Sequence, residues 1–358
     1  MGTQAEACAT RERVSGMRKI KMGVLGVGEM GKRHAENLRR LVPGAELIAI
    51  ADVAEARAKQ VAEELEIEHA FGSLDAMLEL KGLQAVLIAT PDKFHAQAVI
   101  HAAKAGKDIL CEKPLALTMG DAYAALDAVG KAGVQLQVGF MRRYDPAHAA
   151  AMKRIEAGEI GTPLIFKSVG RDKDEPPMAA LQSGVNGMLL YSNTIHDFDL
   201  ARWMMRDEVA EVQTYSTVAT RPEVAKYGDV VASSVNLQYR NGGIGNIESY
   251  ASAAYAYDVR TEILGTKGAV FVGSIEQTPA VFLSANGSSQ MLADHFLTRF
   301  ADAYLAEVRD FVQNLLQDKP VRVTGVAGLK ALATAVAAES SIKQARAVKV
   351  TLERSAAT

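Results

Sequence analysis

The sequence predicts an α/β protein in two parts: a doubly wound parallel sheet, then an α+β part with an open, mostly antiparallel sheet. Three observations support this. Short apolar strands alternate with helices as far as residue 140, strands then follow one another without helices, and 358 residues exceed what one core usually organises. We expect an N-terminal arm, two domains and a tail, at 1–18, 19–143, 144–345 and 346–358.

A glycine-rich turn follows the first strand, 19–25, and opens the first helix, 29–41. The turn reads Gly26-Val27-Gly28-Glu29-Met30-Gly31, a G-x-G-x-x-G motif. The first glycine of such a motif allows a tight bend, the second lets a pyrophosphate approach the backbone, and the third lets the helix pack close to the strand. The helix start offers free N–H groups to phosphates. The motif predicts a Rossmann-type dinucleotide site; a plain tight turn is the alternative.

A carboxylate after the second strand completes this unit. The strand 46–51 ends at Asp52, placed to accept hydrogen bonds from the adenosine ribose hydroxyls. The acid repels a ribose 2′-phosphate, and Val53 and the residues after it offer no immediate cation. Arg57 and Lys59 are expected to face outward. The sequence therefore predicts NAD, with NADP less favoured.

The rest of the first part repeats the strand–helix alternation. Strands are expected at 68–71, 84–89, 107–111 and 134–140, and helices at 54–65, 73–80, 92–105 and 118–132. Such alternation gives parallel βαβ units, whose ligands bind beyond the carboxyl ends of the strands. Side chains at such ends are Asp52, Thr90, Lys113 and the run 141–143.

The pattern changes after Tyr144. Strand-like stretches rich in β-branched residues are joined by tight turns, which predicts an antiparallel sheet. The expected strands are 164–170, 209–218, 230–239, 244–252, 259–264 and 269–272. The expected helices are 146–157, 188–205, 297–317 and 326–345, of which the last two should pack back on the first domain.

Composition excludes several classes of partner. A net charge of −2 leaves no basic footprint for nucleic acid or an anionic membrane, and no apolar run approaches the roughly 18 residues of a membrane span. The cysteines, Cys8 and Cys111, are far apart, and residues 1–18 lack a secretory signal. These features favour a cytoplasmic protein without a disulfide scaffold. No H-x-x-H or C-x-x-C spacing points to a metal.

Three segments together resemble the Gfo/Idh/MocA family of NAD(P)-dependent oxidoreductases. They read Ala89-Thr90-Pro91-Asp92-Lys93-Phe94-His95, Glu112-Lys113-Pro114-Leu115-Ala116 and His196-Asp197-Phe198-Asp199-Leu200-Ala201-Arg202-Trp203, and the match runs from Lys19 to about Ala345. Within the family, the segments 138–145 and 255–258 are most similar to inositol 2-dehydrogenases. The resemblance implies hydride transfer from a ring secondary alcohol of a cyclitol or sugar to NAD.

The resemblance also assigns site residues. Lys113, aimed by a cis bond to Pro114, would hydrogen-bond the reacting hydroxyl, and His196 would exchange its proton. The cofactor pocket would include Gly26, Val27, Gly28, Glu29, Met30, Gly31, Asp52, Val53, Thr90, Pro91, Phe94, His95, Glu112, Lys113 and Met141. Substrate contacts would come from Lys113, Arg142, Ser192, Asn193, His196, Tyr255 and Tyr257.

One position departs from the family pattern. Many members carry Asp four residues before the histidine, on the same helix face, where this chain has Ser192. A serine can hydrogen-bond the imidazole of His196 but brings no charge to raise its basicity.

The substrate and the reaction leave alternatives open. A neutral polyol is favoured because the expected pocket offers few spare cations, although Arg142 and Arg171 allow an acidic substrate. A sugar or glycoside dehydrogenase, with oxidation-assisted elimination of an aglycone, is the nearest alternative function. A non-catalytic cofactor-binding regulator is another, against which Lys113 and His196 argue. The second sheet is expected to expose an apolar face, which a monomer rarely leaves bare. The resemblance implies that these sheets pack together to form dimers or tetramers.

Overall fold

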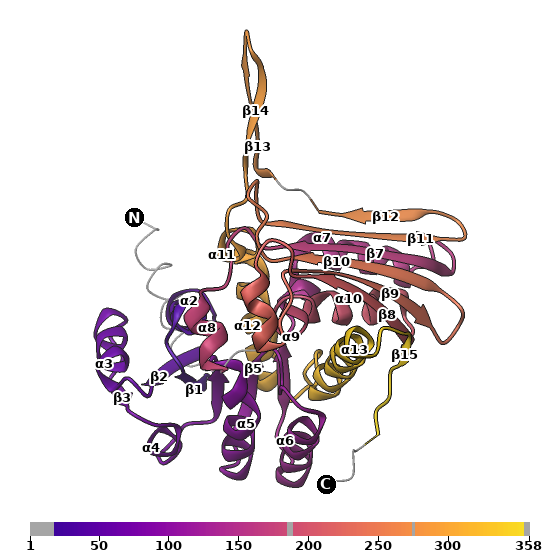
Figure 1. The fold of residues 1–358 in the computed structure, drawn as a ribbon. Helices are drawn as coiled ribbons and strands as arrows, with labels where there is room; N and C mark the ends of the chain where they lie inside the picture. Colours follow the sequence, from indigo (N-terminus) through magenta and orange to yellow (C-terminus); the bar gives the residue numbers. More distant parts are fainter. Residues whose placement is uncertain (1–17, 185–188, 274–275, 354–358) are drawn as a thin grey trace.

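A parallel sheet forms the first part of the protein in a computed structural model that describes residues 18–184, 189–273 and 276–353 (Figure 1). Its six strands lie in the order β3-β2-β1-β4-β5-β6, and all neighbours are parallel. The strands are β1 (Ile20–Leu25), β2 (Ala45–Ala51), β3 (His69–Phe71), β4 (Ala85–Ile88), β5 (Asp108–Glu112) and β6 (Leu136–Gly139). This is the doubly wound order, which places a ligand crevice at the switch point between β1 and β4.

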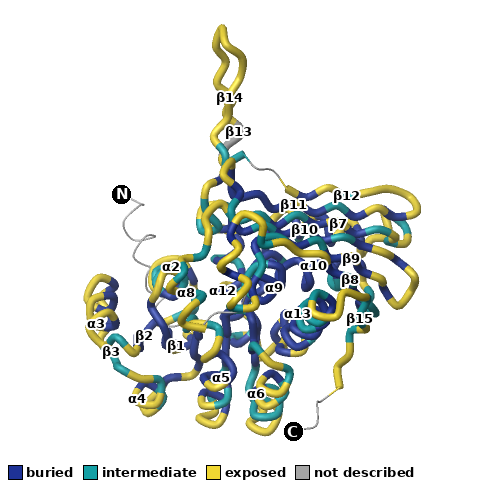
Figure 2. The backbone as a smooth tube through the Cα atoms, in the orientation of Figure 1, coloured by how far each residue is buried: buried dark blue, intermediate teal, exposed yellow. Residues whose placement is uncertain are grey.

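Helices cover both faces of this sheet. They are α2 (Glu29–Arg40), α3 (Glu55–Glu64), α4 (Leu74–Leu78), η1 (Asp92–Phe94), α5 (His95–Lys104), α6 (Met119–Ala132) and η2 (Met141–Tyr144). Two C-terminal helices, α12 (Ala301–Leu316) and α13 (Gly325–Gln344), join them: α12 contributes Val308 and Phe311 to the core on one face, and α13 contributes Leu329 and Leu332 to the core on the other. The buried strands between these layers appear dark blue in Figure 2.

A second, mostly antiparallel sheet forms the other part of the protein, as predicted. Its order is β12-β11-β7-β10-β9-β8-β15, and within it β7 and β10 are parallel while the other pairs are antiparallel. The strands are β7 (Pro163–Arg171), β8 (Val209–Thr217), β9 (Ala232–Tyr239), β10 (Ile244–Tyr250), β11 (Asp258–Gly265), β12 (Ala269–Val272) and β15 (Val348–Lys349). The remaining elements are α7 (Pro146–Glu156), α8 (Met178–Ser183), α9 (Leu189–Ser192), α10 (Ile195–Met205), η3 (Pro222–Tyr227) and α11 (Phe296–Arg299).

The outward face of the second sheet is mixed, so the prediction of an apolar face is wrong. One cross-strand row is apolar and holds Leu264, Ile165 and Ile244. The next row is polar: Lys167 lies 3.8 Å from Glu262, and Asn246 donates to Asn236 at 2.9 Å. Residues two apart along a strand share a face, so apolar and polar rows alternate on the outward face of this sheet.

A hairpin that the sequence did not predict projects from the body of the protein (Figure 1). It consists of β13 (Glu276–Ser284) and β14 (Gly287–Leu292), and it carries exposed Phe282 and Leu283. None of the described helices is long and apolar enough to cross a membrane. The expected arm 1–18, except its last residue, and the tail beyond 353 fall outside the described residues.

The helix predicted over 188–205 is broken in the structure. Residue 188 lies outside the described residues, α9 ends at Ser192, and α10 begins at Ile195. The amides of Asn193 and Thr194 both donate to the Leu189 carbonyl, and the amide of His196 donates to Asn193. The break therefore removes the helical bond between the His196 amide and the Ser192 carbonyl, which then takes a partner from the other part of the protein.

Candidate active site

The glycine turn between β1 and α2 leaves open space at the start of the helix. A Cβ added to Gly31 would lie 1.7 Å from the Gly26 carbonyl oxygen, and Gly26 itself has a φ of +81°. These two glycines are therefore required by the packing of the turn. Around Gly28, by contrast, nothing lies within 4 Å of an added Cβ, and this glycine caps α2 without a side-chain hydrogen bond. The open space at a helix start fits a dinucleotide pyrophosphate.

Asp52 holds this turn in place. One of its carboxylate oxygens accepts the Val27 N–H at 2.9 Å, and the other accepts the Ala54 N–H at 2.8 Å. Arg57 is exposed on α3, and its guanidinium nevertheless lies 3.7 Å from the carboxylate. Lys59 is also exposed and pairs with Glu55 on the surface. Val53 is fully exposed beside this carboxylate.

His95 ties together the loops that follow β4 and β5. Its ring nitrogens lie 2.7 Å from the carbonyl oxygens of Thr90 and Pro114. Pro91 precedes η1, and Phe94, nearly half exposed, ends it. The Lys113–Pro114 peptide bond is cis, as the resemblance implies. His95 thus holds in place the turn that presents Lys113.

A buried acid and histidine support the base of Lys113. Glu112 accepts the Lys113 N–H at 3.2 Å and lies 2.8 Å from His34, and this hydrogen bond together with nearby positive charges lowers the pKa of Glu112 against the opposing effect of burial. Glu307 lies beside the pair, and burial raises its pKa well above the usual range. Among the described residues, His34, Glu112 and Glu307 form the one group of side chains whose ligand atoms lie close enough together to hold a metal ion. His34 already binds Glu112, and Glu307 favours its neutral form although neither oxygen of its carboxyl has a hydrogen-bond partner among the described residues. We therefore interpret the cluster as part of the buried core.

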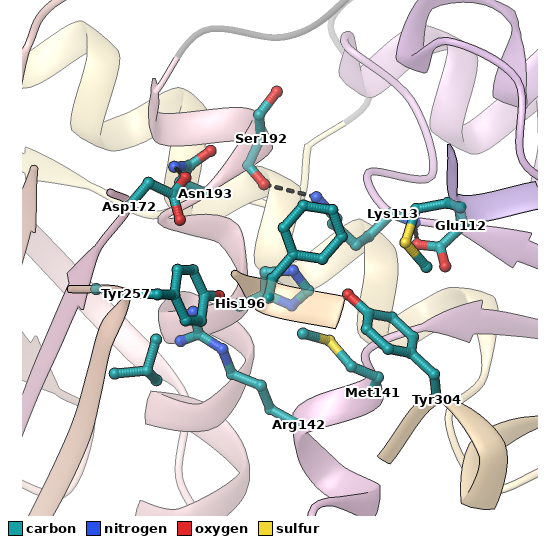
Figure 3. Close-up of a pocket in the computed structure, with 14 residues that line it drawn as sticks. Glu112, Lys113, Met141, Arg142, Asp172, Ser192, Asn193, His196, Tyr257 and Tyr304 are labelled. Atoms are coloured by element: carbon teal, nitrogen blue, oxygen red, sulfur yellow. Dashed lines mark hydrogen bonds between the residues drawn. The ribbon is translucent and has the colours of Figure 1, made fainter. Parts of the chain in front are cut away.

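A pocket of about 150 Å³ lies beyond the ends of β5 and β7 (Figure 3). It is lined by Met30, Glu112, Lys113, Met141, Arg142, Gly170, Asp172, Ser192, Asn193, His196, Tyr257, Val259, Phe296 and Tyr304. Nine of these residues were predicted from the sequence, and five were not: Gly170, Asp172, Val259, Phe296 and Tyr304. Asp172 could have been found, because it is a carboxylate at the end of a predicted strand; Phe296 and Tyr304 carry no sequence signal.

Tyr255 does not line this pocket. It is 47% exposed, donates to Asp258 at 2.5 Å and accepts from Arg171 at 2.7 Å. Arg171 also donates to Glu248 at 2.8 Å. Both side chains are thus occupied outside the cavity, and Tyr257 is the tyrosine of this pair that reaches it.

Lys113 is anchored by the helix break. Its ammonium donates to the Ser192 carbonyl oxygen at 2.7 Å, the oxygen that no longer has the His196 amide as a partner (Figure 3). The Ser192 hydroxyl donates instead to Asp92 at 3.0 Å. The backbone of residue 192, and not its side chain, is therefore what links the lysine to the histidine-bearing helix.

His196 is buried and electrically neutral. Burial, followed by the positive charges of Lys113 and Arg142, lowers the pKa of His196 well below its ordinary value. Its Nδ1 has no hydrogen-bond partner among the described residues, and its ring meets the edge of Phe140 with centroids 6.1 Å apart. An imidazole that stays unprotonated at neutral pH can accept a proton from a substrate.

Two arginine–aspartate pairs set the position of that histidine. Arg142 donates to Asp197 at 2.7 Å with both side chains buried, and Arg143 makes a two-pronged contact with Asp199 at 2.7 and 2.5 Å. The pairs join η2 to α10. The charge of Arg142 is thereby compensated within the pocket wall.

The fold and the site define an NAD-binding oxidoreductase. The chain matches the family model for the NAD-binding Rossmann fold of the Gfo/Idh/MocA oxidoreductases over residues 20–140, and the model for their C-terminal α/β domain over residues 152–352. The protein belongs to this family.

Characterised relatives and solved structures match nearly the whole chain. A scyllo-inositol 2-dehydrogenase (NAD(+)) from Bacillus subtilis is 37% identical, over 94% of this chain and 98% of the relative. A myo-inositol 2-dehydrogenase from Thermotoga maritima is 36% identical, over 92% of this chain and 98% of the relative. The crystal structure of a scyllo-inositol dehydrogenase from Lactobacillus casei with NAD(H) and scyllo-inositol has a TM-score of 0.87 at 28% identity, covering 93% of this chain and 99% of that one.

Two glycines of the turn should respond differently to the same change. Gly31→Ala should lower the free energy of unfolding by roughly 3 kcal/mol or more, because its Cβ would meet backbone. Gly28→Ala should unfold like the wild type but bind NADH at least about 10-fold more weakly, because its methyl group enters the phosphate opening. Denaturant unfolding and NADH titration measure both. Equal NADH affinity in Gly28→Ala and the wild type would contradict the placement.

The pH profile should report His196. Because the pKa of His196 is lowered, the acid limb of the pH profile of kcat/KM for alcohol oxidation should be positioned well below pH 6.5. His196→Gln should lower kcat by roughly 100-fold and remove the limb, whereas His101→Gln, at an exposed position on α5, should change neither. If the acid limb persists in His196→Gln, the group that titrates there is not His196.

Proposed function

We propose that the protein oxidises a ring secondary alcohol of a neutral cyclitol with NAD as the acceptor, as inositol 2-dehydrogenases do. The observation that carries the proposal is a lysine ammonium and a neutral buried imidazole in one pocket, beyond the strand ends of an NAD-binding sheet. Full-length similarity to inositol dehydrogenases that act on the scyllo and myo isomers supports the substrate class.

The pocket residues divide the work of the reaction between them. Bound NAD supplies a hydride acceptor. Lys113, whose ammonium is held at the Ser192 carbonyl, donates a hydrogen bond to the reacting hydroxyl oxygen and stabilises the negative charge that develops there. His196 takes the hydroxyl proton, since its imidazole is unprotonated. Tyr257, Phe296 and Tyr304 line the cavity and exclude water around the reacting carbon.

The charges of the pocket favour a neutral substrate. Arg142 is committed to Asp197, and Arg171 is committed to Glu248 outside the cavity. Lys113 is therefore the cation that faces the substrate, and it is needed to stabilise the reacting hydroxyl. No cation of the pocket is thus left to bind an acidic group of the substrate among the described residues. A sugar or a glycoside remains the alternative substrate class for the same residues.

We further propose that the protein is a cytoplasmic homo-oligomer, a dimer or tetramer, which packs through the second sheet. The apolar row of Leu264, Ile165 and Ile244 would form the apolar part of that contact, and the polar rows would bond across it. The exposed apolar hairpin β13–β14 supplies a second surface that a partner subunit would cover, since a two-stranded hairpin is marginally stable alone.

A substrate panel tests the function. NADH formation with NAD should be found with inositol isomers, and Lys113→Ala should lower kcat by roughly 100-fold or more while NADH affinity stays within a few-fold. Lys107→Ala, a change of the same type at the start of β5 and outside the pocket, is the control. Turnover of sugars or glycosides alone would favour the alternative substrates, and absence of turnover with every polyol would favour a non-catalytic regulator.

A further inference from the structure

The side chain of Ser192 contacts an acid from the other part of the protein. Its hydroxyl donates to the Asp92 carboxylate at 3.0 Å, and the two residues lie 100 positions apart in the chain. Asp92 begins η1, in the loop that follows β4 of the parallel sheet, whereas Ser192 ends α9. The Nδ1 of His196 has no hydrogen-bond partner among the described residues. The proposed reaction gives the contact between Ser192 and Asp92 no role.

A second polar group of the same serine holds the reacting lysine. The Ser192 carbonyl oxygen accepts from the Lys113 ammonium at 2.7 Å. The helix α9 comprises the four residues Leu189–Ser192, and a helix of one turn has too few internal hydrogen bonds to fix its last peptide group by itself. The direction of that carbonyl therefore depends on contacts made by other elements, and the bond from the hydroxyl to Asp92 is a contact of this kind.

The loop that carries Asp92 is fixed to the turn that carries the lysine. The ring nitrogens of His95 lie 2.7 Å from the carbonyl oxygens of Thr90 and Pro114. The threonine precedes Asp92 by two residues, and the proline follows the reacting lysine directly. The serine then links the same loop and the same lysine a second time, through its hydroxyl and its carbonyl. These contacts form a closed ring, so the lysine ammonium and its acceptor are held from both ends.

Resting on the proposed function, we propose that Asp92 is a positioning residue for Lys113. Its carboxylate accepts the Ser192 hydroxyl and so keeps the carbonyl of the same serine directed at the ammonium. Asp92 is not one of the residues that line the substrate cavity, so it acts through the serine and touches no reacting atom. The role needs an acceptor at position 92 and a donor at position 192, and it needs no charge.

Removal of either side of the bond tests this role. Asp92→Ala removes the acceptor and Ser192→Ala removes the donor. Each should lower kcat for inositol roughly 10-fold with NADH affinity within a few-fold, and the double variant should lose no more than either single one. Asp92→Asn keeps an acceptor oxygen and should stay within about 3-fold of the wild type. Asp121→Ala removes an exposed bond of the same type from Thr118, and as the matched control it should leave kcat unchanged.

Exchange of the two side chains is the sharper test. Ser192→Asp places two carboxylates face to face with no donor between them, and it should lower kcat below that of Ser192→Ala. Adding Asp92→Ser restores a hydroxyl–carboxylate pair with its ends exchanged, and it should raise kcat at least about 10-fold above the Ser192→Asp value. An unchanged kcat in Asp92→Ala, or no recovery in a folded exchange variant that binds NADH, overturns the inference.

Chemical labelling provides a readout that does not depend on turnover. Acetic anhydride should modify Lys113 at least about 3-fold faster in Asp92→Ala than in the wild type, because an ammonium without its acceptor is held less strongly in its unreactive, charged form. Peptide mass spectrometry measures the rate against Lys107, whose ammonium is held by the Leu83 carbonyl, as the internal reference. A wild type that oxidises no polyol overturns the proposed function, and the labelling then decides on Asp92 by itself. Equal labelling ratios in Asp92→Ala and the wild type overturn the positioning role.

Discussion

The site depends on two buried arginine–aspartate pairs. Arg142 with Asp197 and Arg143 with Asp199 connect η2, at the end of the nucleotide-binding sheet, to α10, the helix that carries His196. The chain itself does not keep the histidine close to Lys113, because some 80 residues separate 113 from 196. Non-covalent contacts such as these pairs must do so. Removing one partner of such a pair leaves an uncompensated buried charge, at a cost of about 3–5 kcal/mol. The ion pairs thus hold together residues supplied by two separate sheets.

The helix break adds a second link at the same place. Because α9 stops at Ser192, its carbonyl oxygen is available to the Lys113 ammonium, and a backbone group that a continuous helix would have used internally becomes part of the site. A positive charge at that carbonyl is favourable because it lies at a helix C-terminus. The lysine and the histidine are in this way positioned by the same short segment, 192–196, and the positive charge of the ammonium contributes to the low pKa of His196.

The sequence could predict the features that depend on neighbours along the chain. The glycine turn, Asp52, the Glu112–Lys113–Pro114 turn and the strand–helix alternation are local patterns, and the Rossmann fold and the family followed from them. Features that depend on distant contacts were missed. The break at Asn193 is stabilised by Lys113 from another sheet, Asp172 reaches the pocket because β7 lies beside β10, and Tyr255 is drawn away by Arg171 and Asp258. The mixed outer face could have been predicted from the sequence of β7, because Lys167 lies between Ile165 and Val169 on the same face of the strand.

The most direct test of this account is a double-mutant cycle on Arg143 and Asp199, which touch neither the pocket nor the nucleotide turn. Unfolding free energy, kcat for inositol and NADH affinity are measured for Arg143→Met, Asp199→Leu and the double variant. The account predicts that each single variant loses about 3–5 kcal/mol of stability and at least roughly 10-fold in kcat with NADH affinity retained, and that the double variant recovers much of both losses. Single variants with normal kcat, or losses that simply add in the double variant, would contradict the claim that these pairs hold His196 beside Lys113.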